Sequence, residues 1–213
     1  MKKMLIVRPD YDKGTNYLFF WSQEVIDFAQ DKNWHVEKSD REKAIRHEFE
    51  SRLKNNPGFV FINGHGNDDT VIGHDRQPLV DTYNCFLLKG TITFTRACNC
   101  IKSLGKKAVV AGCTTFIGYN REFWVPRLHK FEATPLKDPL AKPVVEVSNA
   151  VPLSLIKGNS VEDAIGSSAT IAEKHILKLI LSKEQYDRVT LKAMINNLGA
   201  LDYEGEKTAK INE

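Results

Sequence analysis

Two short stretches of the sequence, each an apolar run that ends in a polar turn, indicate the architecture of this protein. They are Phe59-Val60-Phe61-Ile62-Asn63-Gly64-His65-Gly66-Asn67 and Thr91-Ile92-Thr93-Phe94-Thr95-Arg96-Ala97-Cys98-Asn99-Cys100. Continuous apolar runs of this length are typical of strands buried on both faces, as in a parallel sheet. If the two strands are neighbours, about 4.8 Å apart, His65 and Cys98 face one cleft, because ligand sites gather beyond the carboxyl ends of parallel strands.

On either side of these stretches, short apolar runs alternate with longer helical patterns. Strands are predicted at residues 4–7, 59–62, 92–94 and 108–111, with a weaker strand at 144–147. Apolar spacing predicts helices across residues 18–29, 45–53, 160–181 and 191–199, with a crossover near 83–88 and a short helix at 100–106. The alternation predicts an α/β fold, a three-layer sandwich with a mostly parallel central sheet and helices on both faces.

The remaining segments read as irregular structure within one domain spanning residues 1–213. Residues 121–143 contain four prolines and little periodicity, so we expect a long surface excursion that can carry function. Its Phe123 and Trp124 are candidates for an apolar wall of a substrate groove. The polar tail, residues 203–213, is expected to fray.

Composition narrows the possible partners. Thirty basic residues are nearly matched by 27 acidic ones, and the net charge of +3 does not predict nucleic-acid binding. No apolar stretch reaches the roughly twenty residues that would span a bilayer. Residues 1–7 read as a first strand rather than a signal peptide, because Arg8 interrupts them early.

The cysteines predict free thiols rather than a metal site. The four residues are Cys85, Cys98, Cys100 and Cys113. The single residue between Cys98 and Cys100 does not match zinc-ligand spacing, so no metal or cofactor is expected. Cys100 and Cys113 read as structural thiols, and reduced cysteines favour a cytoplasmic location.

Residues at the two strand ends have the chemistry of acyl transfer, which needs a nucleophile, a proton carrier and N–H donors for the oxyanion. Cys98 is the candidate nucleophile and His65 the candidate proton carrier. The backbone amides of Gly66 and Cys98 are the candidate oxyanion donors. Gly64 and Gly66 flank the histidine and allow its backbone to turn sharply beside a substrate. Asp68 and Asp69 read as solvated carboxylates and His74 as a surface side chain.

A strand that ends in His-Gly, followed by one that ends in Ala-Cys, resembles the caspase-like cysteine peptidases: caspases, metacaspases, legumains, gingipains and CHAT proteases. Residues 104–112 resemble the segment after the nucleophile in CHAT and gingipain-like members, and residues 160–181 are similar to their late helix. Caspases carry Gln-Ala-Cys where this chain has Arg96-Ala97-Cys98, so the resemblance is to the broader class. It implies a caspase-like sandwich and an endopeptidase that cleaves protein or peptide substrates through a thioester.

The resemblance also implies a specificity pocket. In caspase-like enzymes, the residue two before the nucleophile helps floor the pocket for the side chain that precedes the scissile bond. Here that residue is Arg96, whose guanidinium suits an Asp or Glu side chain. The loop after the first strand also reaches this pocket and supplies Asp10 and Asp12, which could neutralise Arg96 or bind a basic residue. A third interpretation is that Arg96 turns away and braces the fold.

Three other functions compete with a peptidase. A caspase-like domain without activity could bind a peptide or partner protein. A small-molecule enzyme on a flavodoxin-like or amidotransferase-like sheet is less favoured, because glutaminase-type enzymes place the cysteine before the histidine. A nucleotide-binding module is disfavoured by residues 8–12, Arg-Pro-Asp-Tyr-Asp, where a glycine-rich phosphate loop would be needed.

Overall fold

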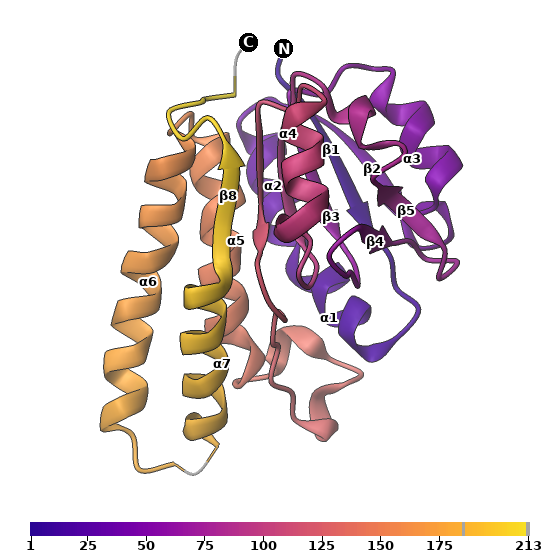
Figure 1. The fold of residues 1–213 in the computed structure, drawn as a ribbon. Helices are drawn as coiled ribbons and strands as arrows, with labels where there is room; N and C mark the ends of the chain where they lie inside the picture. Colours follow the sequence, from indigo (N-terminus) through magenta and orange to yellow (C-terminus); the bar gives the residue numbers. More distant parts are fainter. Residues whose placement is uncertain (185, 212–213) are drawn as a thin grey trace.

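A six-stranded sheet runs through the middle of the molecule in a computed structural model that describes residues 1–184 and 186–211 (Figure 1). The strand order is β2-β1-β3-β6-β7-β8. The strands are β1 (Lys3–Arg8), β2 (His35–Asp40), β3 (Phe59–Asn63), β6 (Ile92–Arg96), β7 (Thr115–Tyr119) and β8 (Leu201–Gly205). All neighbours pair in parallel except β8, which is antiparallel to β7. A separate hairpin, β4 (Thr70–Ile72) and β5 (Pro78–Asp81), follows β3.

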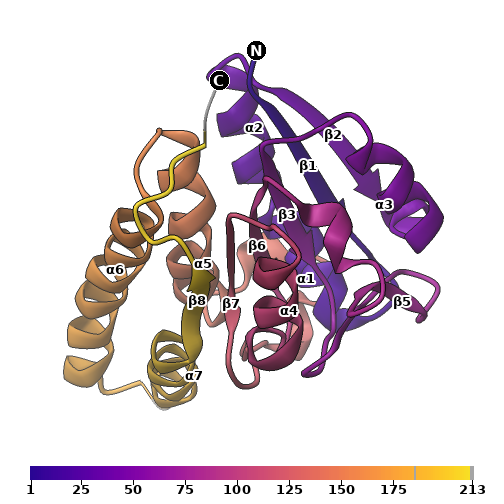
Figure 2. The same cartoon turned by 45° about the horizontal axis from the view of Figure 1, so that its top comes forward.

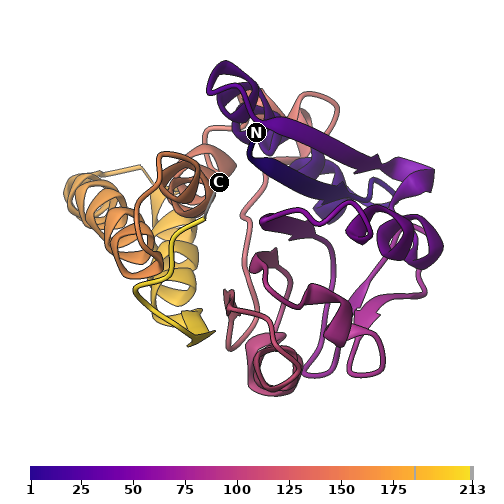
Figure 3. The same ribbon diagram turned by 90° about the horizontal axis from the view of Figure 1, so that it is seen from above.

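Helices cover both faces of the sheet (Figure 3). They are α1 (Lys13–Trp21), α2 (Gln23–Asp31), α3 (Arg46–Leu53), α4 (Lys106–Val110), α5 (Ala141–Ile156), α6 (Val161–Leu181) and α7 (Asp187–Ala200). Short 3-10 turns lie at η1 (Arg41–Lys43), η2 (Cys85–Leu88), η4 (His129–Phe131) and η5 (Pro135–Lys137), and a π-helical turn, η3 (Ile101–Gly105), leads into α4. No helix in the described parts of the chain is long and apolar enough to cross a bilayer.

Alternation along β1 places the two halves of the core on opposite faces. Met4 and Ile6 join the cluster that contains apolar residues of α2 and α5. Leu5 and Val7 join the cluster that contains residues of α3 and α4. Each buried aliphatic side chain contributes roughly 1.5–3 kcal/mol to the free energy of folding. The predicted three-layer α/β architecture is therefore confirmed.

Two predicted strands are wrong. Residues 108–111 lie in and directly after α4, and the strand of this region is β7, further along the chain. Ala108 is buried while Val110 is 90% exposed, so this short apolar run belongs to one face of a helix. Residues 144–147 lie within α5. This helix is buried along most of its length, so its sequence lacks the polar face that identifies an amphipathic helix.

Four strands, β2, β4, β5 and β8, escape sequence analysis because they lack a long apolar run. In β2 only Ser39 is buried, and the hairpin strands β4 and β5 are very short. The segment predicted as one helix across residues 18–29 is two helices, α1 and α2, which meet at Ser22.

The chain after residue 203 is ordered by the sheet, contrary to the predicted frayed tail. β8 pairs along its whole length with β7 (Figure 2). Ala209 and Ile211 are buried in the main core, and the amide of Val161 donates a hydrogen bond to the carbonyl of Ala209 (3.1 Å). Residues 212–213 of the predicted tail lie outside the described residues.

Candidate active site

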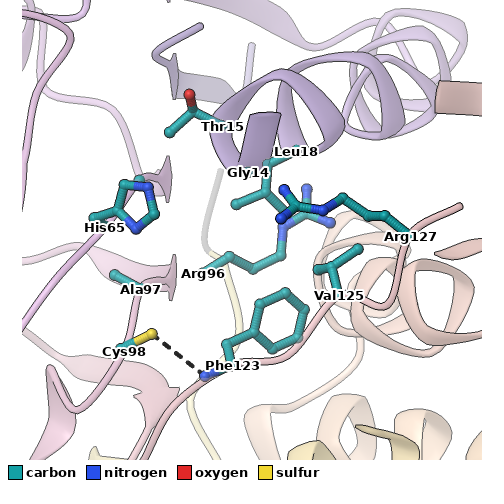
Figure 4. A pocket seen from close by; sticks show the side chains of 11 residues that line it. Gly14, Thr15, Leu18, His65, Arg96, Ala97, Cys98, Phe123, Val125 and Arg127 are labelled. Carbon is teal, nitrogen blue, oxygen red and sulfur yellow. Dashed lines mark hydrogen bonds between the residues drawn. The ribbon is translucent and has the colours of Figure 1, made fainter. Parts of the chain in front are cut away.

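The turns that carry His65 and Cys98 lie side by side. β3 and β6 are hydrogen-bonded neighbours, and the last residues in register are Asn63 and Arg96. His65 and Cys98 each stand two positions beyond that pair. Both side chains border the same pocket beyond the carboxyl end of the sheet (Figure 4). The sequence-based inference that these strands are neighbours is thus confirmed by their pairing.

Two glycines allow close packing around the histidine turn: Gly66 lies against the cysteine turn and Gly64 against strand β4. A Cβ added to Gly66 would lie 2.9 Å from the Cβ of Ala97 and 3.1 Å from the carbonyl oxygen of Cys98. A Cβ added to Gly64 would lie 2.7 Å from the carbonyl oxygen of Ile72. Neither position has room for a side chain without a backbone shift, so glycine is required for this approach.

The imidazole of His65 is oriented by a carboxylate. Its Nε2 lies 2.7 Å from Oδ2 of Asp12, and both side chains are partly exposed. Asp12 is also the N-cap of α1, where Oδ1 accepts a hydrogen bond from the Thr15 amide (2.8 Å). Partial burial acts to raise the pKa of Asp12, but the bonds from Thr15 and His65 outweigh it and hold the pKa below its ordinary value. An ionised Asp12 accepts a hydrogen bond from Nε2–H of His65, so the proton stays on Nε2 and Nδ1 is left as the nitrogen able to exchange a proton.

The Cys98 thiol is half-buried, and its pKa lies above the ordinary value of a cysteine. Burial is the largest cause that raises its pKa, and the nearby charge of Glu122 adds to the effect. The amide of Phe123 donates a hydrogen bond to Sγ (3.4 Å), which acts in the opposite direction. Asn99 follows in the left-handed conformation (φ 60°), a geometry that asparagine tolerates better than most residues.

The backbone amides of Gly66 and Cys98, the predicted oxyanion donors, have no hydrogen-bond acceptor among the described residues. Gly66 and Val71 form an antiparallel β-bridge, but they do not bond to each other. The hydrogen bonds of the bridge join their neighbours: the Ile72 amide donates to the His65 carbonyl (2.8 Å), and the Asn67 amide donates to the Thr70 carbonyl (3.0 Å). Within residues 1–184 and 186–211, neither the Gly66 nor the Cys98 amide donates a hydrogen bond. Unpaired amides beside a nucleophile are the donors that a tetrahedral intermediate needs.

Arg96 is completely buried at the base of the pocket. Its Nε donates to Oδ1 of Asn63 (2.8 Å) and its Nη1 to Oδ1 of Asn149 (2.9 Å). Its guanidinium carbon lies 4.7 Å from the ring centroid of Phe61. Burial lowers the pKa of Arg96 to about 10, with the charges of Tyr119 and Glu24 acting in the opposite direction, so the side chain remains a cation at neutral pH.

The other predicted substrate-binding residues do not reach Arg96. Asp10 accepts hydrogen bonds from Arg41 (3.2 Å) and Asn16 (2.9 Å), away from the pocket lining. Asp12 is engaged by His65 and Thr15. The idea that either carboxylate neutralises Arg96 therefore has no contact to support it among the described residues, because both are held by other partners.

Several residues around the site were missed by sequence analysis. The pocket, about 160 Å³ in volume, is also lined by Gly14, Thr15 and Leu18 of α1 and by Val125 and Arg127 of the segment after β7. A local signal that could have indicated α1 is the pair Asp12 and Thr15, which forms a capping box at its start. Phe123 lines the pocket as expected, whereas the indole of Trp124 turns to Glu122.

The remaining candidates lie apart from this chemistry. All four cysteines are free thiols. Cys100 is buried, its Sγ lies 2.8 Å from Oγ1 of Thr95, and burial raises its pKa to about 11. His74, predicted as a surface side chain, is half-buried. Its Nδ1 accepts a hydrogen bond from the Asp10 amide (3.1 Å). The described residues contain no group of three or more His, Cys, Asp or Glu side chains placed to hold a metal ion.

The order of strands, the helices on both faces and the paired strand-end turns define the caspase-like α/β fold. Among solved structures, the chain is similar to gingipain R (RgpB), an Arg-specific cysteine proteinase, with a TM-score of 0.64 and 10% identity over 99% of this chain and 47% of that chain. It is likewise similar to the complex of the pro- and mature domains of RgpB from Porphyromonas gingivalis (TM-score 0.62, 9% identity, 99% and 48% coverage).

This chain spans about half the length of the gingipain chains it matches. No family model and no curated protein matches its sequence. At this level of identity, the similarity shows that the fold is shared.

Proposed function

We propose that the protein is a cysteine endopeptidase in which Cys98 is the nucleophile and His65 the proton carrier. The observation that carries the proposal is the placement of both residues two positions beyond the Asn63–Arg96 register pair, at one pocket. The fold shared with a cysteine proteinase supports the same reaction class. The free amides of Gly66 and Cys98 add the third requirement of acyl transfer.

The first half-reaction forms a thioester. Cys98 begins as a thiol, so its proton passes to Nδ1 of His65 as Sγ forms a bond to the carbonyl carbon of the substrate. The carbonyl π electrons move to oxygen, and the Gly66 and Cys98 amides stabilise the oxyanion. The C–N bond then breaks as Nδ1–H of His65 protonates the departing amine.

The second half-reaction restores the enzyme. A water molecule loses a proton to Nδ1 of His65 and attacks the thioester carbonyl. Collapse of the tetrahedral intermediate breaks the C–S bond, and the proton returns to Sγ of Cys98. Throughout the cycle, Asp12 keeps the Nε2 proton of His65 in place and stabilises the imidazolium. Asp12 therefore acts as a positioning residue.

Paired variants test this proposal. Cys98→Ser and His65→Ala are expected to abolish hydrolysis of a mixed peptide library, read by mass spectrometry, without loss of the native circular dichroism spectrum. Cys100→Ser is the matched control, since its thiol faces Thr95 in the core, and it should retain most activity. Cleavage by Cys98→Ser, or an inactive Cys100→Ser, would show that the nucleophile is misassigned.

The second candidate is a caspase-like binding domain without activity. The raised pKa of Cys98, whose thiol accepts a hydrogen bond from the Phe123 amide, favours it. Peptidyl acyloxymethyl ketones distinguish the two functions, because a working dyad displaces the acyloxy group and leaves a stable thioether on Cys98. Stoichiometric labelling of wild type that is absent in His65→Ala supports the peptidase. Peptide binding without labelling supports the binding domain.

A further inference from the structure

The buried guanidinium of Arg96 has hydrogen-bonding capacity that the protein does not use. Its Nη2 is buried and has no hydrogen-bond partner in the described parts of the chain. A buried, charged donor without an acceptor is costly and uncommon in folded proteins. Arg96 also forms no ion pair with any described residue, whereas the buried Arg8 is paired with Asp40 at 2.6 Å.

Two amides hold this guanidinium rigidly. The Nδ2 group of Asn63 donates to the Val7 carbonyl (3.1 Å), which turns its Oδ1 towards Arg96. The Nδ2 group of Asn149 donates to the Trp21 carbonyl and to Oε2 of Glu24 (both 2.9 Å), which turns its Oδ1 to Arg96 in the same way. The arginine is therefore braced through Nε and Nη1, and Nη2 is left for another acceptor.

Two arginines, Arg96 and Arg127, line the pocket. A Cβ added to Gly14 would lie 3.3 Å from Oδ1 of Asp12, 3.5 Å from Cε1 of His65 and 3.7 Å from Nη1 of Arg127. No Asp or Glu is among the described residues that line the pocket. Two carboxylates around the site have other partners: Asp12 is bonded to His65 and Thr15, and Glu24 accepts a hydrogen bond from Asn149, which also holds Arg96.

The walls of the pocket are apolar. They consist of Leu18, Phe123 and Val125, with Ala97 beside the nucleophile. An ion pair between such walls is screened less by water than one at the surface. A lysine or arginine side chain placed there would instead meet two like charges with little solvent between them.

We propose that this pocket receives the side chain of an Asp or Glu residue immediately before the scissile bond. The carboxylate of that residue accepts hydrogen bonds from Nη2 of Arg96 and forms an ion pair with Arg127. The proposal rests on the proposed function, because it takes Cys98 as the group that attacks the carbonyl of that residue. It gives this chain the opposite charge preference to the Arg-specific proteinase whose fold it shares.

The test has a catalytic arm and a binding arm. In the catalytic arm, wild-type protein is given fluorogenic peptides that differ only at the residue before the scissile bond: Asp, Glu, Asn, Gln, Leu or Arg. We expect kcat/KM for the Asp or Glu peptide to exceed that for its amide counterpart by about 10- to 100-fold, because charge-assisted hydrogen bonds are the strong ones. A preference for the Leu or Arg peptide would overturn the inference and leave the peptidase proposal standing.

In the binding arm, Cys98→Ala protein is titrated with fluorescent peptides that end in amidated Asp, Asn or Arg, and fluorescence anisotropy is measured. Tighter binding of the Asp peptide, weakened by 300 mM NaCl, supports the pocket even where no peptide is cleaved. Equal binding of the Asp and Asn peptides would contradict it.

Two variants assign the effect to the arginines. Arg96→Gln is expected to remove the Asp-over-Asn preference in both arms. Because Arg96 is buried, its folding is checked by thermal unfolding. Arg127→Ala removes an exposed side chain and is expected to reduce the preference by about three- to tenfold without a change in fold, which keeps the inference testable if Arg96→Gln does not fold.

Discussion

The carboxylate of Asp12 lies 2.7 Å from Nε2 of His65, although 53 residues separate them in the sequence. The same carboxylate caps helix α1 through its other oxygen. Asp12 therefore caps α1 and also fixes the tautomer of His65, because an ionised carboxylate at Nε2 requires a proton on that nitrogen. This pairing links the loop after β1 to the turn after β3, where His65 lines the pocket.

Asp12→Asn is expected to lower kcat by at least about 100-fold with little change in KM. Asparagine still caps α1, since it retains Oδ1, but its amide group would face Nε2 of His65 and favour the wrong tautomer. Steady-state kinetics on a cleaved peptide would measure the effect. Asp10→Asn is the matched control, because Asp10 lies in the same loop and pairs with Arg41 instead. Equal losses in the two variants would contradict a specific role for Asp12.

The Cys98 thiol is expected to alkylate slowly at neutral pH. Burial raises its pKa, so the thiolate fraction at pH 7 is smaller than that of an ordinary cysteine, and the rate with iodoacetamide should keep rising above about pH 8.5. Glu122→Gln removes a charge that also raises this pKa and should move the midpoint to lower pH. Mass spectrometry of the Cys98 peptide follows the rate. A midpoint below that of free cysteine would contradict the raised pKa of Cys98.

Gly66→Ala is expected to destabilise the protein by about 1–3 kcal/mol in the free energy of unfolding. The added Cβ would be 2.9 Å from the Cβ of Ala97 and would separate the two strand-end turns. Chemical denaturation measures the loss. Gly166→Ala in α6 is the control: its Cβ would meet nothing within 4 Å, so it should stabilise by roughly 0.5–1 kcal/mol. A neutral Gly66→Ala would mean that the turns can move apart freely.

Asp138→Ala is expected to loosen the segment between β7 and α5. Asp138 is completely buried and accepts hydrogen bonds from the Tyr17 hydroxyl (2.7 Å) and the amides of Leu128 and Leu140 (2.8 and 2.9 Å). Its loss leaves these donors unpaired, at a cost of roughly 2–3 kcal/mol. Limited proteolysis should then cut residues 121–140 faster than in wild type. Lys137→Ala, at an exposed neighbour, should change nothing, and equal protection of Asp138→Ala would contradict the role given to Asp138.

This segment also shows where sequence analysis was incomplete. Its prolines predict an irregular excursion at the surface, and the structure contains two 3-10 turns there. Its attachments come from distant elements: Asn197 of α7 exchanges hydrogen bonds with both backbone groups of Trp124, and the Pro135 carbonyl accepts one from the Trp21 indole. Such contacts leave no local pattern, because each joins residues far apart in the chain.

The sequence alone determined the parallel sheet and the relative placement of His65 and Cys98. Both follow from local patterns, since a continuous apolar run predicts a buried strand and parallel strands end at the same edge. The tertiary structure alone decided which charges face the pocket. The Asn149 that braces Arg96, the Asp12 that orients His65 and the Arg127 that lines the pocket come from separate elements. Their positions depend on packing between those elements, a property that residue spacing does not encode.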